Sequence, residues 1–188
     1  RPHHLHRPRM TNATELDTWL AQEAAIKHHM RRGPGAGLAD PNQTRGMSGI
    51  DILQSTMAGT LPYSQMSDTL DFVLISATEG TVVFQGAPSE KHLNPMGTVH
   101  GGWFATLLDS ALGCAVWTRI PLGKIYTTAE LSVNMVRALT PKVPRVRAIG
   151  QVIHCGRQLA TAEAKLVGAD GTLYAHATTT CLVLDQKV

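Results

Sequence analysis

The stretch from Asn94 to Asp109 holds the residues whose types and spacing could do chemistry in this chain. His100 and two glycines lead into an apolar segment that we expect to be helical as far as about Thr118, with Asp109 as its only charged side chain. Burying a carboxylate among apolar groups is costly unless it is paired or used. We therefore expect Asp109 to be buried, as a nucleophile, as a base on water, or as a paired structural carboxylate.

The start of this helix could bind a carbonyl oxygen. The first N–H groups of a helix have no partner within it and lie at the positive end of its dipole. Gly101 and Gly102 let a ligand approach that backbone closely, which suits an oxygen gaining negative charge. The same sequence equally suits a plain turn into a helix, with His100 as a structural histidine and Asn94 as a turn residue.

The spacing of His100 and Asp109 predicts that one chain cannot bring them together. Nine residues at a rise of ~1.5 Å and ~100° per residue separate them by about 13.5 Å and about half a turn around the axis. If both serve one reaction, a second chain supplies one of them. The site then lies at the interface of a symmetric dimer.

Apolar residues alternate with polar ones on both sides of this helix, which predicts strands. Asp71–Thr78 and Thr81–Ala87 form a hairpin around the Glu79-Gly80 turn. Four more strands follow, over residues 125–137, 145–154, 158–167 and 172–184. One helix that is apolar nearly all round, among successive antiparallel strands, predicts an α+β domain with a curved sheet wrapped around that helix.

The chain length of 188 residues allows one domain with a core. We assign residues 69–188 to that domain, 47–68 to a helical lead-in, and 1–46 to a polar N-terminal extension and linker, partly helical or disordered. Residues 33–46, rich in Gly, Pro and Asn, form the linker.

Two helices are expected in the N-terminal part, from Glu15 to Arg32 and from Gly49 to Met57. Each is preceded by the residues of a capping box, with Thr14 before the first and Ser48 before the second. The first helix has a short apolar face, so whether it docks is left open.

The distribution of charge and the number of cysteines limit the kinds of partner that the chain could bind. The net charge of +3 comes from the N-terminal 45 residues, so the rest is not a basic nucleic-acid binder. Three cysteines without metal-ligand spacing indicate neither a disulfide framework nor a metal site. We find no membrane span or secretory signal and expect a cytoplasmic protein. Five basic residues between Glu130 and Glu163 are either solvated or face an anion: Arg137, Lys142, Arg145, Arg147 and Arg157.

The motif Asn94-x-x-Gly97-x-x-His100-Gly101-Gly102, followed by Asp109 and then Thr127-Thr128-x-Glu130-Leu131-x-Val133, resembles hotdog-fold acyl-CoA thioesterases. The resemblance is to the phenylacetyl-CoA thioesterase (PaaI-like) branch and covers about residues 69–184. It implies a long helix in a curved antiparallel sheet, a homodimer with shared active sites, and a dimer of dimers.

The resemblance also implies catalytic roles. The backbone N–H of Gly101 and the side chain of Asn94 would polarise the thioester carbonyl, and His100 would steady Asn94 or the departing thiolate. Asp109 of the partner chain would attack the carbonyl or activate water. Thr128 would position that water or the carboxylate.

For substrate binding, the resemblance points to Gly102 and to the Gly156-Arg157 turn, where relatives meet the coenzyme A phosphates. Arg137 is a further candidate, and Arg145 and Arg147 are weaker ones. The expected reaction is hydrolysis of an aryl or medium-chain acyl-CoA to acid and CoA, without metal or cofactor, since coenzyme A is part of the substrate. The alternatives are a hotdog hydratase or dehydratase and a non-catalytic acyl-CoA-binding module.

Overall fold

The alternating segments of the sequence form one six-stranded antiparallel sheet in a computed structural model that describes residues 14–186. The order across the sheet is β1-β2-β4-β5-β6-β3, so β1 and β3 are its edges. The observed strands begin and end within two residues of the predicted bounds: β1 (Phe72–Thr78), β2 (Thr81–Gly86), β3 (Lys124–Met135), β4 (Val146–Cys155), β5 (Leu159–Gly168) and β6 (Leu173–Asp185).

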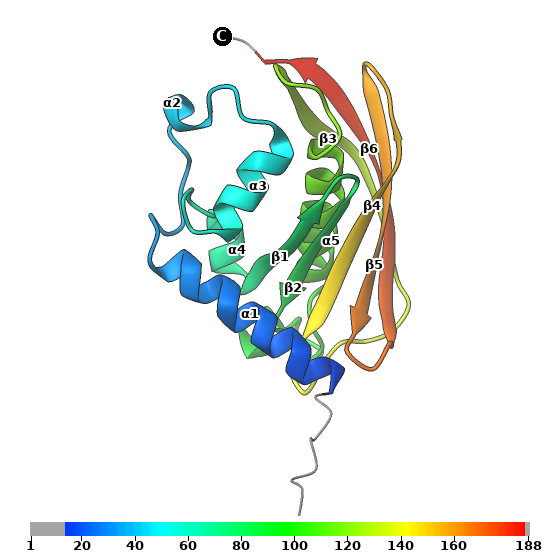
Figure 1. Cartoon of the computed structure of the whole chain (residues 1–188). Helices are drawn as coiled ribbons and strands as arrows, with labels where there is room; N and C mark the ends of the chain where they lie inside the picture. Colours follow the sequence, from blue (N-terminus) through cyan, green and yellow to red (C-terminus); the bar gives the residue numbers. More distant parts are fainter. Residues whose placement is uncertain (1–13, 187–188) are drawn as a thin grey trace, which may run out of the picture.

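The long apolar segment is helix α5 (Gly101–Trp117), which lies against the inner face of the curved sheet (Figure 1). A side chain at Gly150 of β4 would place its Cβ 2.4 Å from the carbonyl oxygen of Ala111, so glycine allows this close approach. The α5 side chains that face the sheet are fully buried: Leu107, Leu108, Ala111, Leu112, Ala115 and Val116. The predicted α+β hotdog fold is confirmed.

Helix α1 (Glu15–Arg31) crosses the outside of the sheet next to β1, β2 and β4 (Figure 1). Its first turn is closed by a capping box, in which Thr14 Oγ1 accepts the N–H of Asp17 at 3.1 Å and the Asp17 carboxylate accepts the N–H of Thr14 at 3.0 Å. The helix docks, which its short apolar face did not predict.

Polar contacts hold α1 to the sheet. Glu23 is buried and accepts hydrogen bonds from Arg145 Nε at 2.6 Å and from Gln85 Nε2 at 2.6 Å. Burial alone would raise the pKa of Glu23, but the hydrogen bonds from Arg145, Lys27 and Gln85 outweigh it and lower the pKa to about 2. The Arg147 guanidinium lies 4.3 Å from the centre of the Trp19 ring.

The segment between α1 and β1 is more structured than a linker. It contains α2 (Pro41–Thr44), α3 (Gly49–Met57) with the predicted bounds, and α4 (Gln65–Thr69), which lies at the end of the predicted helical lead-in but was not predicted as a separate helix. Ala36 forms a parallel bridge with Tyr63. The predicted linker, residues 33–46, therefore contains one short helix, α2. The domain boundaries stay predictions, and residues 1–13 of the extension lie outside the described residues.

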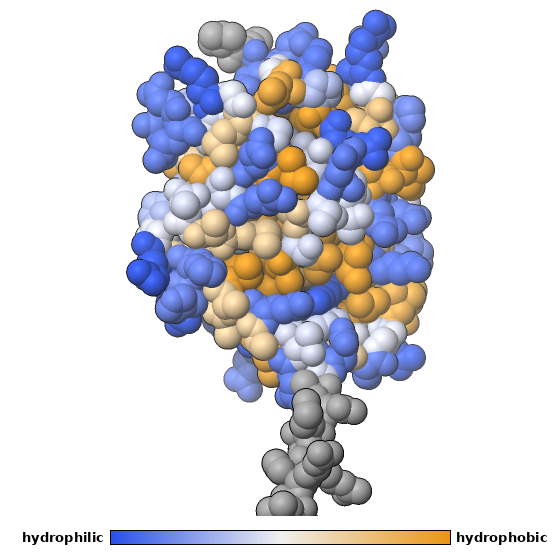
Figure 2. Space-filling model, in the orientation of Figure 1, coloured by the Kyte–Doolittle hydropathy of each residue, from blue (hydrophilic) through white to orange (hydrophobic). Residues whose placement is uncertain are grey.

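One face of the molecule is shown in Figure 2. Hydrophobic residues are visible over the middle of this face, where Figure 1 has β1, β2 and β4.

Within residues 14–186, no helix is long and apolar enough to cross a membrane. The expected compartment stays a prediction.

Candidate active site

The start of α5 leaves one backbone donor available. His100 is the N-cap, and its Nδ1 accepts the N–H of Gly102 at 2.8 Å. In the neutral ring the proton is therefore on Nε2, which can donate to a ligand because His100 is exposed. The N–H of Gly101 has no partner among the described residues. Gly101 and His100 can thus offer two donors at the positive end of the helix.

The residue at position 101 must be small. A Cβ there would lie 2.8 Å from Cε of Met135 at the end of β3. Glycine lets the end of β3 and the start of α5 lie close together. Because Gly101 has no side chain, a ligand can approach its backbone N–H.

Asn94 shapes the loop before the helix. Its Oδ1 accepts the N–H of Met96 at 2.9 Å and that of Thr98 at 3.3 Å, and its Nδ2 donates to Thr98 Oγ1 at 2.9 Å. Gly97 closes the turn with φ of 85°, which glycine adopts without strain. Most of the Asn94 amide is therefore used within its own turn, and one amide hydrogen is left for a ligand.

Asp109 lies in the middle of α5 and contacts the following strand. Thr128 Oγ1 of β3 donates a hydrogen bond to Asp109 Oδ1 at 3.1 Å. Asp109 is half-exposed, so the prediction that it is buried is wrong. The reason is that α5 keeps one partly accessible stripe, made by Ala105, Thr106, Asp109 and Ser110, that the sheet does not cover.

One continuous helix carries both Gly101 and Asp109. The eight residues between them correspond to about 12 Å along the axis. Within one chain, the Asp109–Thr128 pair therefore lies far from the His100–Gly101 donors at the start of the helix. A single chain does not bring the carboxylate and these donors together.

Tyr126 stands beside Asp109 and was missed by the sequence analysis. A Cβ at Gly113 would lie 2.8 Å from the Tyr126 ring, so the ring covers the helix one turn beyond Asp109. The Trp117 ring is next, with its centre 6.2 Å from that of Tyr126. Burial, with Cys114, Cys181 and Asp109 nearby, raises the pKa of Tyr126 well above its usual range. The strand alternation could have found it, since Tyr126 and Thr128 share a face.

The basic candidates are spread over the sheet. Arg137 follows β3 at the Gly101 end of α5, whereas the Gly156-Arg157 turn lies at the other end, beside the start of β3. Arg145 donates to Glu23 of α1, and Arg147 donates to Gln22 of α1 and to Gln85 of β2, so both are already engaged. No single end of this chain collects all of these charges.

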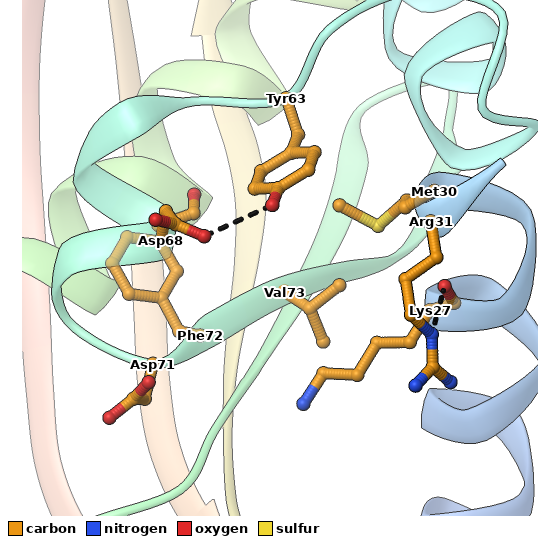
Figure 3. Close-up of a pocket in the computed structure, with 9 residues that line it drawn as sticks. Lys27, Met30, Arg31, Tyr63, Asp68, Asp71, Phe72 and Val73 are labelled. Atoms are coloured by element: carbon orange, nitrogen blue, oxygen red, sulfur yellow. Dashed lines mark hydrogen bonds between the residues drawn. The ribbon is translucent and has the colours of Figure 1, made fainter. Parts of the chain in front are cut away.

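A separate cleft of about 220 Å³ lies between α1, α4 and β1 (Figure 3). Lys27 and Arg31 line one side of it, and Tyr63 donates to Asp68 at 3.0 Å on the other. It shares no lining residue with the Asp109 or Gly101 groups. In the described part of the chain, no three His, Cys, Asp or Glu side chains are grouped so that they could hold a metal ion.

Comparisons with known proteins agree with this fold. A family model described as the thioesterase superfamily matches residues 96–175. A variant of the phenylacetic acid degradation protein PaaI from Thermus thermophilus is 28% identical, with 63% of this chain and 98% of that chain covered and a TM-score of 0.57. A conserved protein from Pseudomonas aeruginosa is 25% identical, with 65% of this chain and 95% of that chain covered and a TM-score of 0.61.

A thioesterase family protein from Silicibacter pomeroyi is 22% identical, with 74% of this chain and 100% of that chain covered and a TM-score of 0.63, and this likeness shows the fold alone. No curated protein matches the chain. The predicted resemblance to the hotdog-fold thioesterase superfamily is confirmed by the family model and the solved structures.

Proposed function

We propose that this chain, which has the hotdog fold and matches the thioesterase superfamily, hydrolyses an acyl-CoA thioester to the free acid and CoA. One observation carries the proposal. An accessible carboxylate, Asp109, is held by Thr128 at 3.1 Å on the same helix whose start offers the unpaired N–H of Gly101. A carboxylate and an oxyanion donor are the two groups that thioester hydrolysis needs.

The two groups meet in a homodimer. The 12-residue edge strand β3 has apolar Ile125 and Met135 exposed on it. Antiparallel pairing of β3 with its copy around a two-fold axis reverses one chain relative to the other. The partner's Asp109 and the partner's Gly156-Arg157 turn then approach the Gly101 end of the first chain, which carries Arg137.

A dimer of dimers has support on the outer face of the sheet. Exposed apolar side chains are neighbours across strands there, since Ile125 pairs with Leu184 and Leu182 pairs with Leu159. Ile153 on β4 is a further exposed apolar residue. Such a patch favours burial against a second dimer. Leu182→Glu should leave dimers where the native protein forms tetramers, as measured by light scattering.

In the proposed reaction, Gly101 N–H and a donor from Asn94 or His100 bind the thioester oxygen and stabilise its negative charge. The partner's Asp109 either attacks the carbonyl carbon or removes a proton from the attacking water. In the first route the C–S bond breaks, CoA leaves as the thiolate, and water hydrolyses the acyl–carboxylate anhydride. In the second route water adds directly and the same bond breaks. Both routes give one acid and one CoA.

The acyl group lies on the apolar side of Asp109. Toward the start of α5 the accessible stripe carries the hydroxyl of Thr106, whereas beyond Ser110, toward the end of the helix, it meets Gly113, Tyr126 and Trp117. An apolar acyl group favours the second direction. The Tyr126 ring, about two strand residues or ~7 Å from Thr128, then limits the acyl group to an aryl or medium-length chain.

The test is a panel of aryl, short, medium and long acyl-CoAs, assayed with a thiol reagent and with the acyl products identified. If the native protein releases CoA and the Asp109→Asn variant does not, the result supports the thioesterase assignment. Interconversion of enoyl and hydroxyacyl thioesters without CoA release would show a hydratase instead. Binding of acyl-CoA with no turnover would show a binding module.

A further inference from the structure

His92 is a buried histidine directly beneath the carbonyl-binding end of the site. It is the last residue of the short 3-10 turn η1 (Glu90–His92) and is only 5% exposed. Its backbone carbonyl accepts the N–H of His100 at 2.7 Å. Its ring stacks on Trp103 of α5, with centroids 5.3 Å apart and planes 25° apart. His92 therefore contacts the residues on both sides of Gly101.

The ring nitrogens of His92 have different surroundings. Nδ1 accepts the backbone N–H of Ser89 at 3.2 Å, which places the proton of the neutral ring on Nε2. Nε2 is buried and makes no hydrogen bond to any described residue. Its nearest carboxylate oxygen is Asp71 Oδ2, at 3.6 Å. A buried donor so close to a carboxylate, yet short of a full hydrogen bond, needs an explanation.

Asp71 has an unusual backbone that aims it at this turn. Its φ of 54° is the only positive value at a non-glycine residue in the described part of the chain. Its carboxylate receives Lys91 Nζ at 2.8 Å. Asp71 also lines the cleft of Figure 3, but its carboxylate points away from Lys27 and Arg31 on the opposite side. The strained residue thus serves the Lys91–His92 turn, and strain of this kind points to function.

We propose that His92 is the positioning residue of the carbonyl-binding loop, and that its neutral ring, held between Ser89, Asp71 and Trp103, fixes the His100–Gly101 main chain for catalysis. Protonation puts a hydrogen on Nδ1, where the Ser89 N–H already points, so that hydrogen bond breaks and Nδ1 donates instead to Ser89 Oγ, 3.3 Å away. The turn that holds His100 then shifts, and the Gly101 N–H leaves its place. The inference rests on the proposed function, since this N–H matters as a carbonyl ligand.

The charges around the ring set the direction of the pH effect. Burial lowers the pKa of His92 below its ordinary value, while Asp71 raises it and Lys91 lowers it. These two are the charged groups that face the ring, because α5 presents the apolar Trp103. A lowered pKa keeps the ring neutral near pH 7, and the active geometry is lost as the pH falls through that pKa.

Two substitutions should move this transition in opposite directions. Asp71→Asn removes the carboxylate while asparagine tolerates the positive φ, so the acid limb of kcat should move to lower pH. Lys91→Met removes the cation, so the limb should move to higher pH. Histidine Cε1 NMR titration should show the pKa of His92 moving in the same two directions as the acid limbs of kcat.

A third variant tests the hydrogen bonds without the titration. His92→Phe keeps a ring against Trp103 and loses the acceptor for Ser89. Its kcat should fall by up to ~10²-fold with little change in KM, since a misplaced catalytic group affects the chemical step. Unchanged kcat in His92→Phe, or acid limbs that do not move apart in the other two variants, overturns the role of His92. If the native protein releases no CoA from any acyl-CoA, the proposed function itself falls.

Discussion

The hydroxyl of Thr128 donates a 3.1 Å hydrogen bond to one carboxylate oxygen of Asp109, across the contact between β3 and α5. This bond fixes the orientation of a half-exposed carboxylate that has no cation among its hydrogen-bond or ion-pair partners in residues 14–186. The second carboxylate oxygen is left for a substrate or a water. This hydrogen bond connects the first half of β3 to the proposed reaction.

Removing the Thr128 hydroxyl should lower kcat. Thr128→Val keeps the shape and loses the bond, and a hydrogen bond to a charged group contributes ~1.5–3 kcal/mol, so kcat should fall by about 10- to 100-fold. Thr128→Ser keeps the hydroxyl and serves as the matched control, with kcat near native. Equal kcat values for the Val and Ser variants would remove Thr128 from the mechanism.

The Gly101 N–H can be removed by proline. His100 has φ of −62° and ψ of 137°, which suits a residue before proline, and proline is favoured at the first helical position. Because a side chain at 101 meets Met135, the substitution belongs in a Met135→Ala background, which also serves as its control. Losing an oxyanion donor should lower kcat by ~10²–10³. An unchanged kcat with an unchanged helix content would exclude this N–H.

Asn94 can be tested in its two roles separately. Asn94→Asp keeps the oxygen that accepts the Met96 and Thr98 N–H groups but removes the Nδ2 donor. If the amide binds the thioester oxygen, kcat should fall by ~10²–10³ while the melting temperature stays close to native. Retention of native kcat, despite the added negative charge, would make Asn94 a turn residue only.

Tyr126 should set the acyl-length limit. Tyr126→Ala opens the space over Gly113 toward Trp117, so the ratio of kcat/KM for long over medium acyl-CoAs should rise by about tenfold or more. Tyr126→Phe keeps the ring and should keep the native profile. Identical chain-length profiles for the Ala and Phe variants would place the acyl group elsewhere.

Glu23 should make α1 docking sensitive to acid. Its pKa of about 2, below the ordinary 4.5, means that the stability it contributes is present above pH 4.5 and is lost as the pH falls toward 2. Glu23→Gln should lower the free energy of unfolding by ~3 kcal/mol at pH 7, with the difference shrinking below pH 4. The exposed Glu79, replaced by Gln, is the control. A constant difference between pH 7 and pH 2.5 would contradict the assignment.

The strands and α5 were predictable because alternation and continuous apolarity are local properties of the sequence. The docking of α1 was not, because it depends on Glu23 meeting Arg145, which is 122 residues away, and such pairing leaves no apolar pattern. The same contact removes Arg145 from the candidate phosphate ligands, which the run of basic residues alone could not reveal.

Within the site, the Asn94 turn and the His100 cap follow from local residue types, so sequence reasoning could name them. The exposure of Asp109 could not be predicted, because it depends on which side of α5 the sheet leaves open. His92 gave no signal in sequence, since its importance comes from the Asp71 and Trp103 contacts made in the fold.

The central claim is that each active site takes Gly101 from one chain and Asp109 from the other. Asp109→Asn and Gly101→Pro, each made in the Met135→Ala background, should each retain at most ~1% of the kcat of that background when tested alone. In a mixed dimer of the two, one site carries both defects and the other carries none. Equal mixing gives half mixed dimers, so kcat should return to about a quarter of the Met135→Ala value. No recovery, with mixed dimers present by mass spectrometry, would contradict the shared site.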